Sequence, residues 1–317
     1  MEPSFGIVVP VGPGPQEINR VRDLLDSLET YEPGNFHLVL VDDAMVERGL
    51  PQEVGGLSPN CVAVIKNPRN GRGNGWDSGC AAAVLAGLGE LSNKNVAFAL
   101  KLDTDALVIR PFADRIIARF RDNPGVGMLG SRYFAEGSEP DRDWIRSMAR
   151  VLEKLQRQFA VWRKTNVRAF PALQIALWGK DRKIRDTIRL AFINGFRAGD
   201  HCQGGAYALS RACLRGFEQC GHLKDPLLWL RAPIPDDHLL ALCVKAIGFH
   251  FRSFDQDGEP FACAWAGLPD TPENLVKRGF GIVHSVKDHG DRTEVETRAF
   301  FKARRSEARA ERSRCPC

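Results

Sequence analysis

Several features that would assign the chain to a common class are missing from its sequence. The 317-residue sequence contains no run of 18 apolar residues, so it predicts no membrane-spanning helix. The first residues contain neither a basic start nor a long apolar core, so no signal peptide is predicted. The nine cysteines form no CxxC pair and are odd in number, which indicates reduced thiols rather than a disulfide framework. We therefore expect a cytoplasmic protein.

Signatures of nucleic-acid binding are also missing. The sequence contains no zinc-finger spacing, no recognition-helix pattern and no aromatic RNA-binding motif. The net charge of +5 is modest, and residues 291–317 form a charged tail that adds to it and that we expect to be frayed. A phosphate-bearing small ligand explains this balance as well as an anionic membrane surface does. We expect no nucleic-acid partner and leave open a peripheral contact with the inner face of a membrane.

The pattern of the first 131 residues is that of an α/β protein. Hydrophobic residues make up 44% and charged residues 26% of the chain, which is typical of a globular domain. Continuous apolar segments alternate with amphipathic ones, which predicts a doubly wound, mostly parallel sheet. The expected strands are residues 5–11, 36–41, 61–66, 96–102 and 126–131, and the expected helices are residues 16–30, 76–91 and 111–121.

The second half is less regular. Basic amphipathic helices are expected at residues 141–164 and 180–196, either as a packed stretch with a solvated face or as a membrane-facing surface. Strands are expected at 206–209, 249–254 and 280–284, and helices at 211–218, with Ser210 as the cap, and at 237–247. We therefore divide the chain into a ligand-binding half (1–134), a helical insert (135–200), a second half (201–290) and the tail.

The most informative motif is Asp103-Thr104-Asp105, which directly follows the apolar run 96–102. It places two carboxylates at the carboxyl edge of the predicted sheet, where open α/β folds bind ligands. Oxygen ligands of this kind suit Mg²⁺ or Mn²⁺, which often share their coordination with substrate phosphates. The alternative is a strand followed by a solvated acidic turn.

Other motifs carry two interpretations each. Arg69 and Arg72 lie in a glycine-rich loop and could hold phosphate or could be exposed charges. Asp236 and Asp237 begin an expected helix, as caps or as a catalytic pair. A zinc site is conceivable but its spacing matches no standard pattern; its residues would be His201, Cys202, Cys213, Cys220 and His222.

Taken in order along the chain, these motifs resemble those of GT-A fold glycosyltransferases, particularly the inverting family 2. The resemblance rests on the first strand with Pro10 and Val11, the Asp42-Asp43 pair, the loop 67–79, Asp103-Thr104-Asp105 and Pro235-Asp236-Asp237-His238-Leu239-Leu240. It covers residues 5–290 and is weakest in 135–200. It implies a GT-A fold with a helical insert.

The resemblance also implies roles for individual residues. In the family an aspartate such as Asp43 contacts the nucleobase, Asp105 is the direct metal ligand, and Asp103 meets the ribose or the metal's water. A late histidine often completes the metal site, for which His284 is the candidate and His289 the rival. Asp237 matches the family's base, with Asp236 where glutamate is commoner. The remaining donor- and acceptor-side residues implied are Pro10, Val11, Arg69, Arg72, Thr104, Gly204 and Gly205.

The resemblance implies a metal-dependent enzyme that moves a sugar from a nucleotide diphosphate, most often UDP, to a glycan or glycolipid hydroxyl with inversion. Manganese or magnesium would be the cofactor, and the insert would shape the acceptor side. One alternative is a sugar nucleotidylyltransferase, which would need an Arg- and Lys-bearing glycine loop that segment 10–15 lacks. The other alternative is a GT-A-like binding subunit without catalysis.

Overall fold

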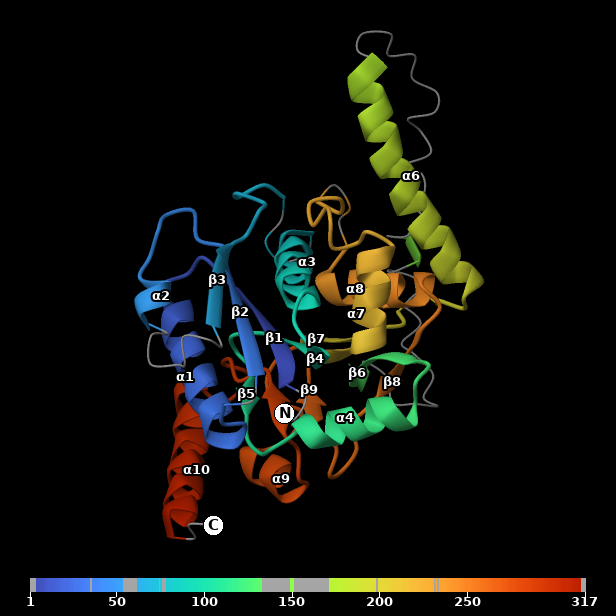
Figure 1. Ribbon diagram of the computed structural model, residues 1–317. Coiled ribbons are helices and arrows are strands. Elements are labelled where there is room, and N and C mark those ends of the chain that lie inside the picture. Colours follow the sequence, from blue (N-terminus) through green and yellow to red (C-terminus); the bar gives the residue numbers. More distant parts are fainter. Residues whose placement is uncertain are drawn as a thin grey trace.

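The fold is organised around a seven-stranded sheet with strand order β3-β2-β1-β4-β7-β6-β8 (Figure 1). The computed structural model describes residues 4–34, 36–53, 62–73, 75, 78–132, 149–150, 171–197, 199–230, 232 and 234–314. Strands β3, β2, β1 and β4 run parallel, as do β6 and β8, whereas β7 is antiparallel to both of its neighbours. The predicted α/β fold with a mostly parallel sheet is therefore confirmed.

The first half of the sheet is formed by the apolar segments that the sequence marks as strands. Its strands are β1 (Ser4–Val11), β2 (Phe36–Asp42), β3 (Val62–Lys66), β4 (Val96–Leu102) and β6 (Val126–Arg132). Its helices are α1 (Gln16–Tyr31), α2 (Leu50–Glu53), α3 (Ser78–Ser92) and α4 (Ala113–Asp122). The predicted elements differ from these by at most two residues at each end.

The second half contains longer and additional elements. They are α6 (Pro171–Ile193), β7 (Cys202–Ser210), α7 (Arg211–Gln219), α8 (Asp236–Ala246), β8 (His250–Ser253), β9 (Phe261–Cys263), α9 (Pro272–Lys277), β10 (Ile282–His284) and α10 (Glu294–Arg314). The predicted cap is present, because the Ser210 side chain accepts a hydrogen bond from the Cys213 amide. The expected helix at 141–164 lies outside the described residues.

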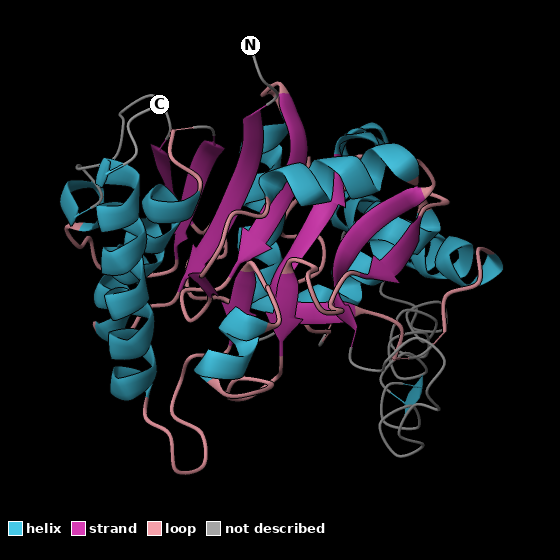
Figure 2. Cartoon of the chain, turned by 90° about the horizontal axis from the view of Figure 1, so that it is seen from below, coloured by secondary structure: helices cyan, strands magenta, loops and turns pink. Residues whose placement is uncertain are grey.

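Helices cover both faces of the large sheet (Figure 2). Successive side chains of a strand point to opposite faces, so Val8 joins one core while Ile7 and Val9 join the other. The Val8 core is closed by α3, α6, α7 and α8, and the other by α1 and α4. The pattern of continuous apolar strands follows from this double burial.

A small second sheet lies beside the carboxyl ends of the central strands. It has the order β5-β10-β9, where β5 is the two-residue strand Leu107–Val108 that directly follows the acidic motif. Strand β10 pairs antiparallel with β5 and parallel with β9. This arrangement brings the end of β10, residue 284, to the acidic motif 180 residues earlier in the chain.

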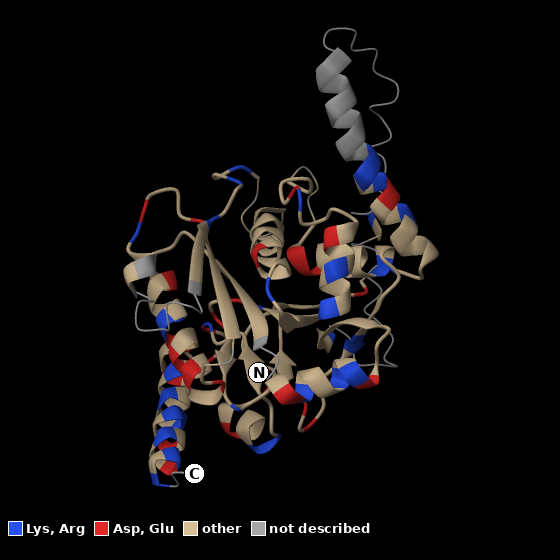
Figure 3. Cartoon of the chain, viewed as in Figure 1, with Lys and Arg blue, Asp and Glu red and all other residues tan. Residues whose placement is uncertain are grey.

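The prediction of a frayed C-terminal tail is wrong. Residues 294–314 form helix α10, which lies against α1 with acidic residues of α1 facing basic residues of α10 (Figures 1 and 3). Arg305 is buried in this contact with its guanidinium on Asp23 and Asp26, whereas Phe301 on another side of α10 packs into the core beside the small sheet. Some of the charges that indicate a solvated tail in the sequence therefore have partners on α1, namely those of Glu294, Arg298, Arg305 and Arg309.

The structure also bears on the membrane question. Across the residues that it describes, none of the helices combines the length and the apolar character needed to cross a bilayer.

Candidate active site

Asp105 is a buried carboxylate held by three groups from the end of β10 and the residues that follow it. Its Oδ2 accepts a hydrogen bond from Ser285 Oγ at 2.6 Å and lies 3.1 Å from Lys287 Nζ and 3.3 Å from His284 Nε2. Burial opposes ionisation, but the charges of His284 and Lys287 outweigh it and hold the pKa of Asp105 well below its usual range. Asp105 is therefore an anion in the folded protein.

His284 is oriented so that one ring nitrogen faces both acids of the motif. Its Nε2 lies 3.3 Å from Asp105 Oδ2 and 3.8 Å from Asp103 Oδ2, while its Nδ1 lies 3.0 Å from the Ala264 carbonyl oxygen. A hydrogen bond from Nδ1–H to a backbone carbonyl is the usual way in which a protein aims Nε2 at a metal. Burial opposes a proton on the ring, but Asp105 favours it and raises the pKa of His284.

These three residues fit a divalent cation. Ligand atoms of Asp103, Asp105 and His284 all lie within 4.8 Å of one another, and two carboxylates with one imidazole are a donor set that suits Mn²⁺ or Mg²⁺. The structure thus brings together the residues predicted as metal ligands.

Gly205 makes room for the His284 ring. A Cβ atom at this position would lie 2.1 Å from ring atoms of His284, closer than any real contact allows. The Gly205 carbonyl also accepts a hydrogen bond from the Asp103 amide at 2.9 Å. A glycine is therefore required here by close packing, and it links β7 to the acidic motif.

A buried lysine connects the acidic motif to the second acidic pair. Lys101, with 1% of its side chain exposed, places Nζ 2.7 Å from Asp103 Oδ1 and 3.5 Å from Asp236 Oδ2. It also donates a hydrogen bond to the Gly204 carbonyl. Because one cation contacts both carboxylates, the two predicted acidic motifs share one site.

Asp236 lies deep in this site at the start of α8. Tyr207 donates a hydrogen bond to Asp236 Oδ2 at 3.4 Å. Burial raises the pKa of Asp236 to about 6, although Lys101 opposes the rise. Asp236 therefore holds a proton more readily than an ordinary aspartate does.

Asp237 has a different environment. Its Oδ1 lies 2.7 Å from His238 Nδ1 and accepts the His238 amide at 2.8 Å, while Oδ2 lies 3.8 Å from His201 Nε2. Burial opposes ionisation of Asp237, but His238 outweighs it and lowers the pKa of the carboxyl below its usual range. A Cβ on Gly204 would lie 3.3 Å from Asp237 Oδ2, so this glycine leaves space beside the carboxylate.

His201 and His238 stack with their ring centroids 3.9 Å apart. Together with Asp237 they form a second group of close ligand atoms among the described residues. Burial lowers the pKa of His201 to about 4, so the ring is neutral near pH 7. His201 thus joins Asp237 and His238 and not Cys213 and Cys220, and the zinc set considered from the sequence is not among the groups found in the described chain.

The residues expected to hold the nucleotide lie at the carboxyl ends of β1 and β2. Val11 pairs with Asp42, and the Asp43 amide bonds to the Val11 carbonyl at 3.0 Å, next to Pro10. Asp43 pairs with Arg69, whose Nε and Nη2 lie 2.6 and 2.5 Å from its two oxygens. The Asp43 carboxylate is thus held by Arg69 at this edge of the sheet.

The two loop arginines are used differently. Arg69 Nη1 donates to the carbonyls of Arg72 and Gly73 at 2.9 and 3.1 Å, so this guanidinium shapes the loop. Arg72 donates from Nε to the Arg69 carbonyl at 2.9 Å, and its side chain is exposed. A phosphate contact by Arg69 or Arg72 stays a prediction. His289 packs on Gly267, away from the three metal-ligand candidates grouped above.

Sequence reasoning missed Lys101, Ser285 and Lys287. A lysine inside the buried run 96–102 is the signal that could have revealed the first, because a buried ammonium needs anionic partners. Ser285 and Lys287 lie one and three residues after His284, but nothing in their spacing indicates that they contact Asp105. Their role becomes visible only when β10 pairs with β5.

No protein-family model matches the sequence, and no curated protein sequence matches it. Solved structures do. Core-mannan synthase A from Aspergillus fumigatus, in its Mn/GDP form, is 9% identical with a TM-score of 0.41, and the match covers 79% of this chain and 72% of that one. Galactosyltransferase LgtC, in complex with donor and acceptor sugar analogues, is 12% identical with a TM-score of 0.48, and the match covers 96% of both chains.

A third match is partial. TarS from S. aureus, as residues 1–349 in complex with UDP-GlcNAc, is 20% identical with a TM-score of 0.30, and the match covers 45% of this chain and 38% of that one. At these identities the likeness concerns the fold alone.

Proposed function

We propose that the protein is a metal-dependent glycosyltransferase that moves a sugar from a nucleotide diphosphate donor to an acceptor hydroxyl with inversion. Asp103, Asp105 and His284 would hold Mn²⁺ or Mg²⁺, and that ion when bound would neutralise the departing diphosphate. The donor we favour is a UDP-sugar, as the motif resemblance implies, and the acceptor a glycan or glycolipid.

One observation carries this proposal: Lys101 contacts both Asp103 and Asp236. A sugar transferase needs a site for the diphosphate leaving group and a base for the acceptor within the length of one sugar. The Lys101 contacts give that proximity, because a single lysine side chain bridges the acidic motif and the paired aspartates at the start of α8. A solvated acidic turn would not lie so close to a second buried acidic pair.

The donor would lie along the carboxyl edge of the sheet. Pro10 and Val11 end β1, Asp43 follows β2 and Thr104 separates the two acids, so these residues line one edge from which a nucleotide can reach the metal-ligand candidates. Arg72, being exposed in the loop after β3, is better placed than Arg69 to approach a phosphate, because Arg69 already pairs with Asp43.

Asp237 is our proposed base. Its carboxylate is ionised, and Gly204 leaves open space beside Oδ2, so it can accept a proton from an acceptor hydroxyl. His238 holds the carboxylate in place through its ring Nδ1 and its amide. Asp236 is the second choice, since its raised pKa suits proton transfer but Lys101 and Tyr207 occupy its oxygen. Attack by the activated hydroxyl opposite the leaving diphosphate inverts the anomeric centre.

A panel of nucleotide sugars tests the proposal. The purified chain is incubated with each of UDP-, GDP- and dTDP-sugars, with Mn²⁺, with Mg²⁺ or with chelator, and release of the nucleoside diphosphate is measured. We expect metal-dependent release with at least one donor, and NMR of the product should show inversion. Release of pyrophosphate from a nucleoside triphosphate and a sugar phosphate would instead favour a nucleotidylyltransferase. Nucleotide binding without turnover would favour the binding subunit.

A further inference from the structure

The backbone of the turn that carries Asp103 and Asp105 is held from two distant parts of the chain. Within the turn, the Asp103 carbonyl accepts the Ala106 amide at 3.0 Å. The Asp105 carbonyl accepts the Val286 amide at 3.0 Å, and the Thr104 carbonyl accepts Arg298 Nη2 at 3.3 Å. Two of the three carbonyls are thus fixed by residues that follow β10, and one of these, Arg298, belongs to the region that the sequence presents as a tail.

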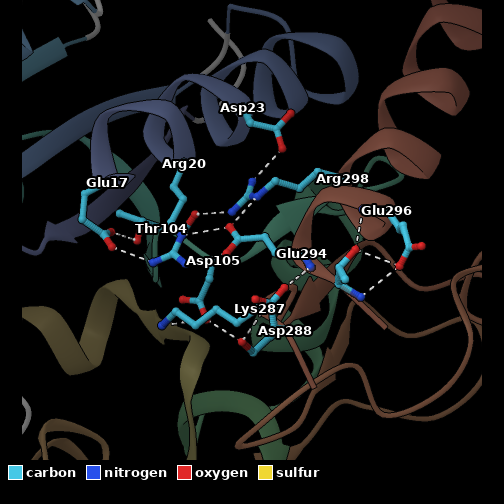
Figure 4. Close-up of polar contacts among 12 residues, drawn as sticks. Glu17, Arg20, Asp23, Thr104, Asp105, Lys287, Asp288, Glu294, Glu296 and Arg298 are labelled. Carbon is cyan, nitrogen blue, oxygen red and sulfur yellow. Dashed lines mark hydrogen bonds and ion pairs between the residues drawn. The ribbon is translucent and has the colours of Figure 1, made fainter. Parts of the chain in front are cut away.

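Arg298 reaches Thr104 from the second turn of α10 and is itself held by acids of two helices (Figure 4). Its Nη1 lies 2.6 Å from Asp23 Oδ2 on α1, and its Nε lies 2.7 Å from Glu294 Oε1. A planar guanidinium with three engaged nitrogens is fixed in position and direction, which a lysine could not reproduce.

The side chain of Thr104 is held as well. Its hydroxyl donates a hydrogen bond to Glu17 of α1, and Glu17 pairs with Arg20 at 2.7 Å. Arg20 in turn places Nε 2.8 Å from Glu294, the same carboxylate that Arg298 contacts. Together with Thr104, the side chains of Glu17, Arg20, Glu294 and Arg298 thus form a closed ring of contacts, which can be followed in Figure 4.

The ring is shielded from solvent, so that its ion pairs can hold α10 and the acidic turn in a fixed relative position. Its side chains are between 10% and 18% exposed, so water screens these ion pairs less than it screens pairs on an open surface. A metal site tolerates only small displacements of its ligands, about half an ångström. The position of the turn, and with it both carboxylates, therefore depends on where α10 docks.

We propose that Arg298 is a positioning residue for the Asp103–Asp105 turn, so that docking of α10 on α1 sets the affinity of the acidic motif for its divalent cation. The inference rests on the proposed function only in taking that cation to be the metal of the transferase. Arg298 itself contacts the backbone carbonyl of Thr104, between the two metal-ligand candidates of the turn, and not their carboxylates.

The same interface offers a matched control. Arg309, about three turns further along α10, also binds α1, with Nη2 2.6 Å from Asp26 Oδ1, but its hydrogen bonds go to Asp26 and not to the acidic motif. Arg309→Ala and Arg298→Ala each remove one arginine that joins the two helices. Only Arg298→Ala removes the contact to Thr104.

A calorimetric titration of the full chain with Mn²⁺ alone tests the proposal. Thermal melting is measured on the same samples. We expect Arg298→Ala to weaken Mn²⁺ binding about tenfold or more, which is the size typical of losing a residue that supports a metal ligand. Arg309→Ala should bind Mn²⁺ within about twofold of the parent. Mn²⁺ binding by Arg298→Ala within about twofold of the parent overturns the proposal.

Hydrogen exchange at the Ala106 and Val286 amides gives a metal-free readout. These amides bind the turn's carbonyls, so Arg298→Ala should speed their exchange and Arg309→Ala should not. If the parent itself binds no Mn²⁺, the proposed function fails, and exchange then decides the inference alone. Faster exchange confined to Arg298→Ala supports the positioning role, and equal exchange in the two variants contradicts it.

Discussion

Lys101 Nζ lies 3.5 Å from Asp236 Oδ2, although 135 positions separate the two residues in the chain. The same ammonium lies 2.7 Å from Asp103 Oδ1, so one buried cation serves two carboxylates of different elements. Burial alone would lower the pKa of Lys101, but Asp103 and Asp236 outweigh it and raise that pKa, so the lysine stays charged. The site is therefore arranged around an internal positive charge as well as around the metal-ligand candidates.

Replacing Lys101 by methionine should destabilise the fold. Methionine keeps much of the volume but leaves Asp103 and Asp236 without their common partner, and breaking a buried pair typically costs about 3–5 kcal/mol. The free energy of unfolding from urea titration measures this. The double variant Lys101→Met/Asp236→Asn should be less destabilised than the sum of the single variants, because the amide no longer needs the cation. Additive losses would show that the contact is not coupled.

Gly205→Ala tests the close packing behind His284. The added Cβ would lie 2.1 Å from the His284 ring, which must then move. We expect a loss of about 1–3 kcal/mol in stability, and Mn²⁺ affinity should fall by about 10- to 100-fold. Gly125→Ala is the matched control, because its Cβ meets nothing within 4 Å, and it should leave Mn²⁺ binding unchanged. Parent-like Mn²⁺ binding by Gly205→Ala would remove His284 from the ligand set.

Asp237→Asn should separate catalysis from binding. Removing a general base typically lowers the rate by about 100- to 10,000-fold, whereas asparagine is close in size and suits a helix start as well as aspartate does. Transfer should collapse while Mn²⁺-dependent UDP binding stays near the parent value. The melting temperature should fall, because the lowered pKa of Asp237 means that its charge stabilises the fold. Asp236→Asn is the comparison. A transfer rate within a few-fold of the parent in Asp237→Asn, with collapse in Asp236→Asn, would move the base to Asp236.

The α1–α10 contact should weaken in acid. Burial would raise the pKa of Asp26 and of Glu294, but the arginines of the contact outweigh it and lower both. A carboxylate whose pKa is lower in the folded than in the unfolded state stabilises the fold above about pH 4 and loses that contribution as the pH falls through the folded value. Asp26→Asn should therefore be less stable than the parent at pH 7 and lose less on acidification. Thermal melting from pH 7 to pH 3 measures this, and parallel curves for the two proteins would contradict it.

The sequence predicts best those parts of the fold in which the local pattern of apolar residues indicates which side chains are buried. Strand β4 reads as a strand because Phe98, Leu100 and Leu102 fill one core and Ala99 the other. The acidic motif is predictable for the same reason, since it follows a buried strand. The expected metal ligand His284 is found at the motif because β10 pairs with β5, which the apolar run before it only partly indicates.

Contacts between distant elements were not predictable. The charges of α10 indicate a solvated tail, since nothing local reveals that Arg298 and Arg305 have acidic partners on α1. The antiparallel direction of β7 is likewise invisible in its apolar pattern, although it is what delivers Gly204 and Gly205 to the acidic motif. Expectations that concern residues 133–148 and 151–170 lie outside the described residues and stay predictions.

Calorimetric titration of UDP into the parent and into Asp105→Asn, with and without Mn²⁺, tests the central claim most directly. Asp122→Asn is the control. It changes an aspartate whose side chain is 64% exposed and which, among the described ion pairs, is paired only with its neighbour Arg121. The parent and Asp122→Asn should bind UDP only with Mn²⁺, and Asp105→Asn should lose that metal-dependent binding, because an amide cannot replace the charge of a metal-ligating carboxylate. Equal UDP affinity of Asp105→Asn and the parent in Mn²⁺ would contradict the account.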